Sequence, residues 1–268
     1  DHEYNVRDRD VLLLGPAVAD MTDNFEEFWN SEFAHPVESL LKDISHEITA
    51  MDVEKKSREL HAYASDPKNF KPQIRDAITL APGKFPSIVK AMSWEDVAFI
   101  SDIPGKNSGE QGLGGGGEST QQLIDAVRNA KSSILIQSPY LVMPEGGIEL
   151  FKALVDRGVR IRISTNSLAS TDNIQAFSGY HGQRKALLKA GVELYEFKPY
   201  PAIRDELIER FPDLAVRNPV FAIHEKSMVI DDKTVFIGTF NLDPRSANLN
   251  TEVGMLADSI ELARQLTA

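Results

Sequence analysis

The chain has 268 residues, no cysteine and a formal net charge of −11 at pH 7. This acidic balance argues against broad nucleic-acid binding, which depends on an excess of Lys and Arg, and the absence of cysteine excludes disulfides and thiolate metal sites. With 42% hydrophobic and 26% charged residues, and no apolar run long enough to cross a bilayer, the composition is typical of a soluble globular protein.

The first hundred residues predict helices and strands without a regular alternation. An apolar run at residues 11–14 predicts a buried strand that ends at Gly15. Apolar residues then recur every three or four positions, which predicts an amphipathic helix over residues 18–29. Four further elements are expected: a short helical turn at 36–42, a charged helix at 44–64, a loop with Pro67 and Pro72, and a strand at 97–101.

Residues 101–119, SDIPGKNSGEQGLGGGGES, mark the sharpest change in composition. Segments rich in Gly and Ser lack side chains that pack, so a flexible linker is the favoured interpretation. A phosphate-binding loop is the alternative. The segment lacks the order GxxxxGK[ST], and its lysine, Lys106, precedes the glycine run.

Residues 120–268 predict an α/β fold. Helices are predicted over 120–130, 149–156, 182–189 and 259–266, and strands over 133–137, 159–165 and 192–197. Because strands and helices alternate along the chain, we expect a mixed, largely parallel sheet with helices on both faces. Ligands of such sheets bind where loops meet at the strand ends.

The segment HEKSMVIDDKTVFIGTFN gathers groups that bind phosphate esters. A strand predicted over residues 222–230 places His224 and Lys226 on one face, because alternate residues of a strand point the same way. Two neighbouring cations can hold one tetrahedral anion. Each of these residues taken alone is more simply explained as an ordinary surface or core residue. The prediction of a phosphate site therefore depends on the joint pattern.

A hairpin is predicted to complete this arrangement. A polar turn at residues 231–233 separates the first strand from a second one at 235–240. The return strand brings the amide of Asn241 towards Lys226, and His224 is left for proton transfer or for attack on phosphorus. Asp231, at the turn, is expected to anchor backbone groups or to pair with a lysine.

Other residues are candidates for positioning or for substrate contacts. Tyr140 either hydrogen-bonds a phosphate oxygen and walls the pocket, or packs with its hydroxyl in water. Arg245 and Ser246 supply a cation and a hydroxyl just past the motif. Glu252 is expected to accept a hydrogen bond from the His224 ring and fix its tautomer. The six histidines show no metal-ligand spacing, so neither a catalytic metal nor a cofactor is expected.

The joint pattern is similar to a known signature. His-x-Lys, four residues, Asp, six residues, Gly-Thr-x-Asn is the motif of the phospholipase D superfamily. Its positions are occupied by His224, Lys226, Asp231, Gly238, Thr239 and Asn241. Much of the chain, from VLLLGPAVADMTDNFEEFWNSE to NLDPRSANLNTEVG, also resembles bacterial phospholipase D family proteins of the cardiolipin synthase C type.

The resemblance implies an αβα sandwich in two pseudo-symmetric lobes, each with one motif, around a single active site. It implies phosphatidyl transfer or hydrolysis of phospholipids at a bacterial envelope membrane, through a phosphohistidine and without a metal. By similarity His224 is the acid/base, Lys226 and Asn241 bind the phosphate of the phosphatidyl head group, and Gly238 and Thr239 line the substrate site.

The sequence departs from this pattern because it contains a single His-x-Lys. We therefore expect a fragment: residues 1–100 as the remnant of an N-terminal lobe without its motif, 101–119 as a linker, and 120–268 as the C-terminal lobe. A second copy of the chain in a homodimer, or the missing lobe, would complete the site, and a nucleic-acid partner is not expected. The alternatives are a nuclease of the same superfamily and a non-catalytic phosphate-binding fragment.

Overall fold

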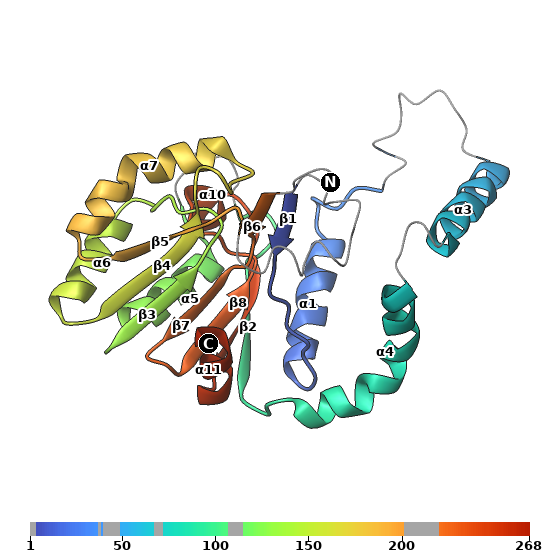
Figure 1. Ribbon diagram of the computed structural model, residues 1–268, viewed down its shortest axis with the longest axis horizontal. Helices are drawn as coiled ribbons and strands as arrows, with labels where there is room; N and C mark the ends of the chain where they lie inside the picture. The colour runs from blue at the N-terminus through green and yellow to red at the C-terminus, as the bar shows by residue number, and fades with distance from the viewer. Residues whose placement is uncertain (1–3, 37–38, 40–48, 67–71, 107–114, 201–219) are drawn as a thin grey trace.

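The computed structural model describes residues 4–36, 39, 49–66, 72–106, 115–200 and 220–268. A seven-stranded sheet forms its centre (Figure 1). In spatial order the strands are β2 (Val97–Ser101), β9 (Val253–Asp258), β8 (Thr234–Gly238), β7 (Ser227–Ile230), β3 (Ser133–Gln137), β4 (Arg160–Asn166) and β5 (Glu193–Phe197). Helices pack on this sheet, so the predicted α/β class is confirmed.

The strand directions correct the expectation of a largely parallel sheet. Among the described strands, β3, β4 and β5 run parallel to one another. The pairs β3 with β7, β7 with β8, β8 with β9, and β9 with β2 are antiparallel. The expectation was wrong because the hairpin at residues 231–233 turns β8 back along β7 and β9 then returns along β8, so among the described neighbouring strands only β3, β4 and β5 are joined by helical crossovers.

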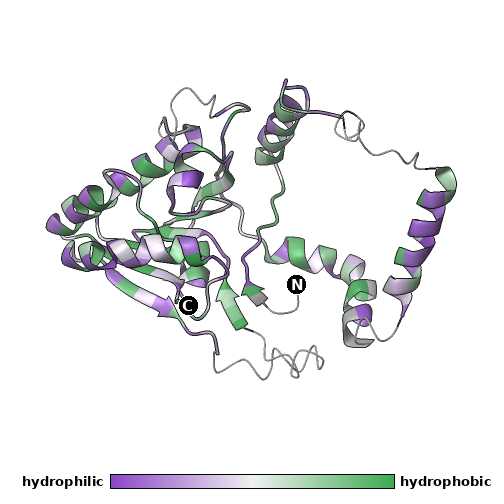
Figure 2. Cartoon of the chain, turned by 90° about the horizontal axis from the view of Figure 1, so that it is seen from above, coloured by the Kyte–Doolittle hydropathy of each residue, from purple (hydrophilic) through white to green (hydrophobic). Residues whose placement is uncertain are grey.

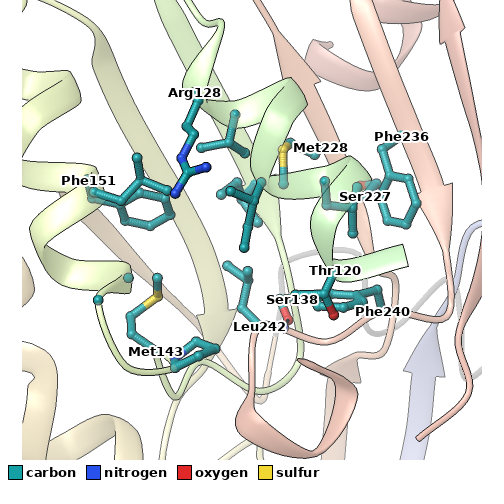
Figure 3. Close-up of a pocket in the computed structure, with 18 of the residues that line it drawn as sticks. Thr120, Arg128, Ser138, Met143, Phe151, Ser227, Met228, Phe236, Phe240 and Leu242 are labelled. Atoms are coloured by element: carbon teal, nitrogen blue, oxygen red, sulfur yellow. Dashed lines mark hydrogen bonds between the residues drawn. The ribbon is translucent and has the colours of Figure 1, made fainter. Parts of the chain in front are cut away.

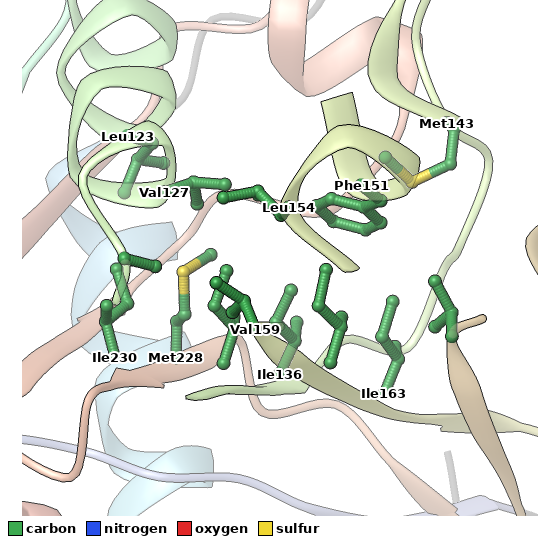
Figure 4. Packing of buried hydrophobic residues seen from close by; sticks show 14 of the residues in the cluster. Leu123, Val127, Ile136, Met143, Phe151, Leu154, Val159, Ile163, Met228 and Ile230 are labelled. Carbon is green, nitrogen blue, oxygen red and sulfur yellow. The ribbon is translucent and has the colours of Figure 1, made fainter. Parts of the chain in front are cut away.

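The main hydrophobic core lies between one face of the sheet and α5 (Glu118–Arg128), α6 (Gly147–Asp156) and α7 (Ile174–Lys189). Figure 4 shows side chains of α5 and α6 lying over a row of side chains from the strands. The buried residues on the two sides include Leu123, Val127, Phe151, Leu154, Ile136 and Met228. Each such side chain contributes about 1.5–3 kcal/mol when fully buried, so this layer fixes the helices on the sheet.

A smaller core covers the opposite face. There α11 (Ile260–Thr267) places Ala263 against Val229 and Val235, and all three are at most 3% exposed. Helices therefore lie on both faces of the sheet, as predicted. None of the helices within the described ranges has the length and apolar content that a bilayer crossing requires.

The N-terminal third is more open. β1 (Tyr4–Arg7) pairs in parallel with β6 (Val220–Ile223) in a separate two-stranded sheet, and α1 (Ala17–Trp29) contacts β2. Next come α3 (Ala50–Ser65), which has no buried residue, and α4 (Pro72–Ala91). Both stand away from the seven-stranded sheet in Figures 1 and 2.

Two sequence predictions for this part were wrong. Residues 11–14 form no strand, and Leu12 is 50% exposed, because β1 takes up the pairing with β6 earlier in the chain. Helix α4 begins at Pro72, within the predicted loop, and continues over residues for which no element was predicted, since Pro82 and Pro86 inside it hide the helical pattern. The helix at 18–29 and the strand at 97–101 are confirmed. The turn expected at 36–42 and the start of the helix at 44–64 lie largely outside the described residues.

Candidate active site

Residues 224–226 connect two sheets instead of lying within one strand. The strand predicted at 222–230 is divided into β6, which belongs to the small sheet, and β7, which belongs to the large one. The backbone N–H groups of His224 and Glu225 both donate to the carbonyl of Arg7, with N to O distances of 2.8 and 3.2 Å. This extended connection is therefore attached to the N-terminal strand.

Two side chains brace the same connection. The amide of Asn166 bonds both the carbonyl and the N–H of Ile223, each at 2.9 Å. The fully buried carboxylate of Glu225 forms an ion pair with Arg9. Both contacts lie next to His224 and restrict the backbone that carries it.

Asp8 contacts the imidazole ring of His224. Nδ1 of His224 lies 2.8 Å from Oδ2 of Asp8, and the two side chains are 42% and 45% exposed. Partial burial alone would raise the pKa of Asp8, but the hydrogen bond to His224 and the charges of His224 and Lys226 lower it below its usual range. Because Asp8 occupies Nδ1, the other ring nitrogen, Nε2, is the atom left to meet a substrate.

The expectation that Glu252 bonds the His224 ring was wrong. Its carboxylate accepts a hydrogen bond from the hydroxyl of Thr239 at 2.5 Å, and the residue is 4% exposed. The Thr239 hydroxyl also accepts the N–H of Val253 at 3.0 Å, across the ends of β8 and β9. Glu252 therefore positions Thr239, and β1 brings a different carboxylate to His224.

Lys226 is a nearly buried cation among carboxylates. The residue is 9% exposed, and its ammonium group donates to the backbone carbonyl of His224 at 2.5 Å. Burial lowers its pKa, whereas the negative charges around it act to raise the pKa. These charges belong to Asp8, Glu252, Asp172 and Asp243. The ammonium group thus lies where residues from four separate segments meet.

Asn241 follows β8 on the return leg of the hairpin. Its backbone N–H donates to the hydroxyl of Ser246 at 3.1 Å. Its side-chain oxygen is buried and has no hydrogen-bond partner within the described part of the chain. Such an atom normally finds a partner, so the amide is a candidate for contact with a ligand.

A short helix, α10 (Pro244–Asn248), supports this loop. Asp243 caps the helix and accepts the N–H of the fully buried Ser246 at 2.8 Å. Burial raises the pKa of Asp243 despite these bonds. The predicted ligand residue Ser246 therefore has a structural role, and Arg245 is exposed on the same helix.

Tyr140 lies at the same edge of the sheet. Its hydroxyl donates to the carboxylate of Asp172, with distances of 3.0 and 3.1 Å to the two oxygens. Burial, followed by the charge of Asp172, raises the pKa of Tyr140 to about 12, and Asp243 adds to the effect. Tyr140 thus belongs to the carboxylate-rich surroundings of Lys226.

Two residues of the motif, Gly238 and Asp231, have structural roles. Gly238 pairs with Gly254 across β8 and β9, and a Cβ at Gly238 would lie 2.4 Å from the carbonyl oxygen of Val253. Its role is close strand packing. Asp231 lies at the other end of β7 from Lys226, so the structure does not bring it to His224.

Asp231 ties the hairpin to the start of β3. Its carboxylate accepts the backbone N–H groups of three consecutive residues at 2.7 to 3.0 Å: Lys131, Ser132 and Ser133. Partial burial alone would raise the pKa of Asp231, but these hydrogen bonds and one from the Ser132 hydroxyl lower it. The carboxylate thus anchors backbone groups, the role expected for it at the turn.

A buried ion pair underlies the site. Lys106 and Asp102 have side chains 1% and 0% exposed, with Nζ 2.7 Å from Oδ2. Lys106 also donates to the carbonyl of Ser246 at 2.8 Å, and Asp102 accepts the N–H of Glu252 at 2.9 Å. The carboxylate of Asp102 also accepts hydrogen bonds from the backbone N–H and the hydroxyl of Ser119. The described ends of the glycine-rich segment are therefore attached to the site.

Sequence reasoning missed Asp8, Asp102 and Asp172. A carboxylate at the end of a strand, as at Asp102, was an available signal, but Asp8 reaches His224 through pairing between strands more than 200 residues apart. Among the described residues, no cluster of three or more His, Asp or Glu side chains is arranged to hold a metal ion.

Comparison with known proteins identifies the family of the chain. The family model described as "Cardiolipin synthase, PLD-like domain" matches residues 123–268, which include the hairpin and its supporting loops. The chain belongs to this family. PLD-like relatives extend the match: cardiolipin synthase C of Escherichia coli K12 is 34% identical over 262 residues, which are 96% of this chain and 52% of that protein.

Other PLD-like proteins match more distantly. Cardiolipin synthase A of Buchnera aphidicola is 29% identical over 146 residues, or 54% of this chain and 25% of that protein. The chain spans about half the length of the curated relatives that it matches over most of its own length. Among solved structures, the phospholipase D family member Nuc of Salmonella typhimurium aligns with a TM-score of 0.43 and 16% identity, covering 65% of this chain and 90% of Nuc.

Proposed function

We propose that this chain supplies one half of an active site for phosphodiester exchange on phospholipids, of the cardiolipin synthase or phospholipase D type. The observation that carries the proposal is the desolvated Lys226 two residues from a half-exposed His224, whose Nδ1 is held by Asp8. Nε2 of His224 is then free for proton transfer, and Lys226 with Asn241 offers donors to phosphate oxygens.

In the proposed reaction His224 acts as acid and then as base. A histidine of the other half attacks phosphorus, the bond from phosphorus to the leaving alcohol oxygen breaks, and His224 gives its Nε2 proton to that oxygen. An acceptor alcohol or water then gives its proton back to Nε2 while its oxygen displaces the histidine from phosphorus. Asp8 supports both steps because it stabilises the charged imidazolium.

The local charges favour a lipid over a nucleic acid as the substrate. Four carboxylates surround Lys226, so a polyanion would be repelled, whereas one diester with a neutral or cationic head group adds only a single charge. This balance also favours a second half that brings further cations. A separate lobe with its own motif would provide them, and a second copy of the chain would add a second His224 and Lys226.

The test is exchange of phosphatidyl groups in mixed micelles of phosphatidylglycerol, measured at high protein concentration. His224→Ala should lower the rate at least about a thousandfold, because cooperating catalytic groups are not replaced singly. His181→Ala, on an exposed face of α7, is the matched control and should stay within about twofold, as surface changes usually do. Full turnover in His224→Ala would refute the proposed chemistry.

A further inference from the structure

An apolar cavity of about 210 Å³ lies beside the candidate active site, between α5 and α6 (Figure 3). Its walls are core side chains of these helices and of the sheet. In Figure 3, Phe151 and Met143 lie on one side, Phe236 and Phe240 on the other, and Leu242 between them. The cavity is therefore lined by hydrocarbon on opposite sides.

The cavity shares its lining with the loops that carry the site. Asn241 lies between Phe240 and Leu242, which both line the cavity, and Ser227, next to Lys226, lines it too. The segment of Asn241 is joined to the loop after β3, since the N–H of Leu242 donates to the hydroxyl of Ser138 at 3.1 Å. The cavity thus adjoins the segments that carry Lys226 and Asn241.

The hydroxyl groups that line the cavity already have hydrogen-bond partners, and its two charged lining residues, Arg128 and Glu145, are exposed. The Ser138 hydroxyl already donates to the carbonyl of Tyr140 at 2.7 Å, and the Ser227 hydroxyl donates to the side chain of Gln137 at 3.3 Å. The charged group of Arg128 lies at the far end from Ser138 and Leu242 (Figure 3). A ligand that gains free energy here must do so by burying hydrocarbon.

We propose that this cavity binds part of one hydrocarbon chain of the phospholipid whose phosphate is held at Lys226 and Asn241. The proposal rests on the proposed function, because the occupant is the tail of the same substrate. The volume equals that of about seven water molecules in the liquid, so it takes a segment of a fatty chain and not its whole length. The site thereby selects a phosphodiester that carries a tail.

Binding of a soluble ligand series tests the proposal without turnover. Glycerophosphocholine and alkylphosphocholines of six, eight and ten carbons, kept below their micelle-forming concentrations, are titrated calorimetrically into the His224→Ala variant. Affinity should rise about fourfold for each methylene that enters the cavity and then level off. Equal affinity for tailless and tailed ligands would overturn the proposal.

Filling the cavity provides the decisive comparison. Val127→Phe and Leu150→Phe, each in the His224→Ala background, place a larger side chain in the cavity from α5 and from α6. Two variants are used because one of them could fail to fold. Either folded variant should lose the dependence on chain length while its affinity for glycerophosphocholine stays unchanged. Leu188→Phe, at a position 53% exposed on α7, is the matched control and should keep the dependence.

The outcomes separate the two proposals. If chain length raises the affinity equally in filled and unfilled variants, the tail lies elsewhere and the inference is wrong. If the dependence requires the open cavity but the protein with His224 intact exchanges no phosphatidyl groups, the cavity assignment stands and the proposed reaction fails.

Discussion

Lys226 shows how one residue serves the site at a cost to the fold. Folding lowers its pKa below the ordinary 10.5 because burial penalises the charged form. A lysine whose pKa falls on folding destabilises the native state at every pH below its folded pKa, and this cost disappears as the pH rises towards 10.5. At neutral pH the full cost is present.

We therefore expect Lys226→Met to raise the free energy of unfolding at pH 7 by about 1 kcal/mol while phosphodiester turnover falls at least about a hundredfold. Denaturant titration and the micelle assay measure the two effects. Lys233→Met removes an exposed lysine paired with Asp258 and should leave turnover intact. A marked loss of stability in Lys226→Met would show that the ammonium group holds the fold together.

The charged form of Asp231, unlike that of Lys226, stabilises the native state. Its pKa is lowered on folding, so its contribution to stability is present above the ordinary pKa of 3.8 and is lost as the pH falls through the lower folded value. Asp231→Asn should cost about 1–3 kcal/mol at pH 7, and the difference from the wild type should shrink below pH of about 4.

Asp232→Asn is the control for this prediction. Asp231 and Asp232 both have positive φ, 54° and 53°, in the three-residue turn at 231–233, where asparagine is tolerated. Replacing either residue by asparagine therefore adds little backbone strain. A pH-independent difference for Asp231→Asn, or an equal effect of Asp232→Asn, would contradict the assigned role.

At the scale of elements, the buried pair of Lys106 and Asp102 fixes the start of the glycine-rich segment under α10 and β9. Lys106→Met should lower the free energy of unfolding by about 3–5 kcal/mol, because it leaves Asp102 as an unpaired buried charge. The pair Lys152 and Asp156 has the same i,i+4 spacing and a similar distance of 2.6 Å, but both side chains are exposed.

Lys152→Met is thus a matched control and should cost less than about 0.5 kcal/mol. Thermal and denaturant unfolding of the two variants give the comparison. Similar small losses in both would mean that the segment at Lys106 behaves as the passive linker that its composition predicts.

Sequence periodicity predicted many elements because their patterns are local. The hairpin of β7 and β8 follows from two apolar runs around a polar turn, and the helices α5, α6 and α11 from repeats of three and four. Strand direction in the sheet, and the division between β6 and β7, depend on pairing with distant segments. Those features could not be predicted from one chain without its contacts.

The sequence likewise located the motif residues of the candidate site but not the partners that the fold brings to them. His224, Lys226 and Asn241 lie together in the sequence pattern, so the motif located them. Asp8 could not be identified from the sequence, since its contact with His224 depends on the parallel pairing of β1 with β6. Glu252 was assigned to His224 because it lies close in sequence, whereas the Thr239 hydroxyl occupies it in the fold.

The whole molecule carries a net charge of −11, and its site gathers four carboxylates around Lys226. If two copies combine their sites, activity per chain should rise with protein concentration and then level off, and light scattering should show a dimer over the same range. Added salt should strengthen this pairing by screening repulsion between the acidic copies. Activity per chain that does not change with concentration would rule out completion by a second copy.

The attachment of β1 beside His224 has a practical consequence for anyone who joins another polypeptide to this one. A polypeptide joined ahead of Tyr4 continues from the end of β1 that pairs with Val220, while the other end of this strand leads to Arg7 and Asp8, which bind the backbone and the ring of His224. A fusion that disturbs β1 therefore also disturbs His224. Helix α11 packs on the other face of the large sheet, but its last turn reaches the same region, because the guanidinium of Arg9 donates to the carbonyl of Leu266 at 3.3 Å. A purification handle or fluorescent label joined next to β1 or to α11 therefore needs a flexible spacer, so that it leaves Arg9 and the imidazole undisturbed.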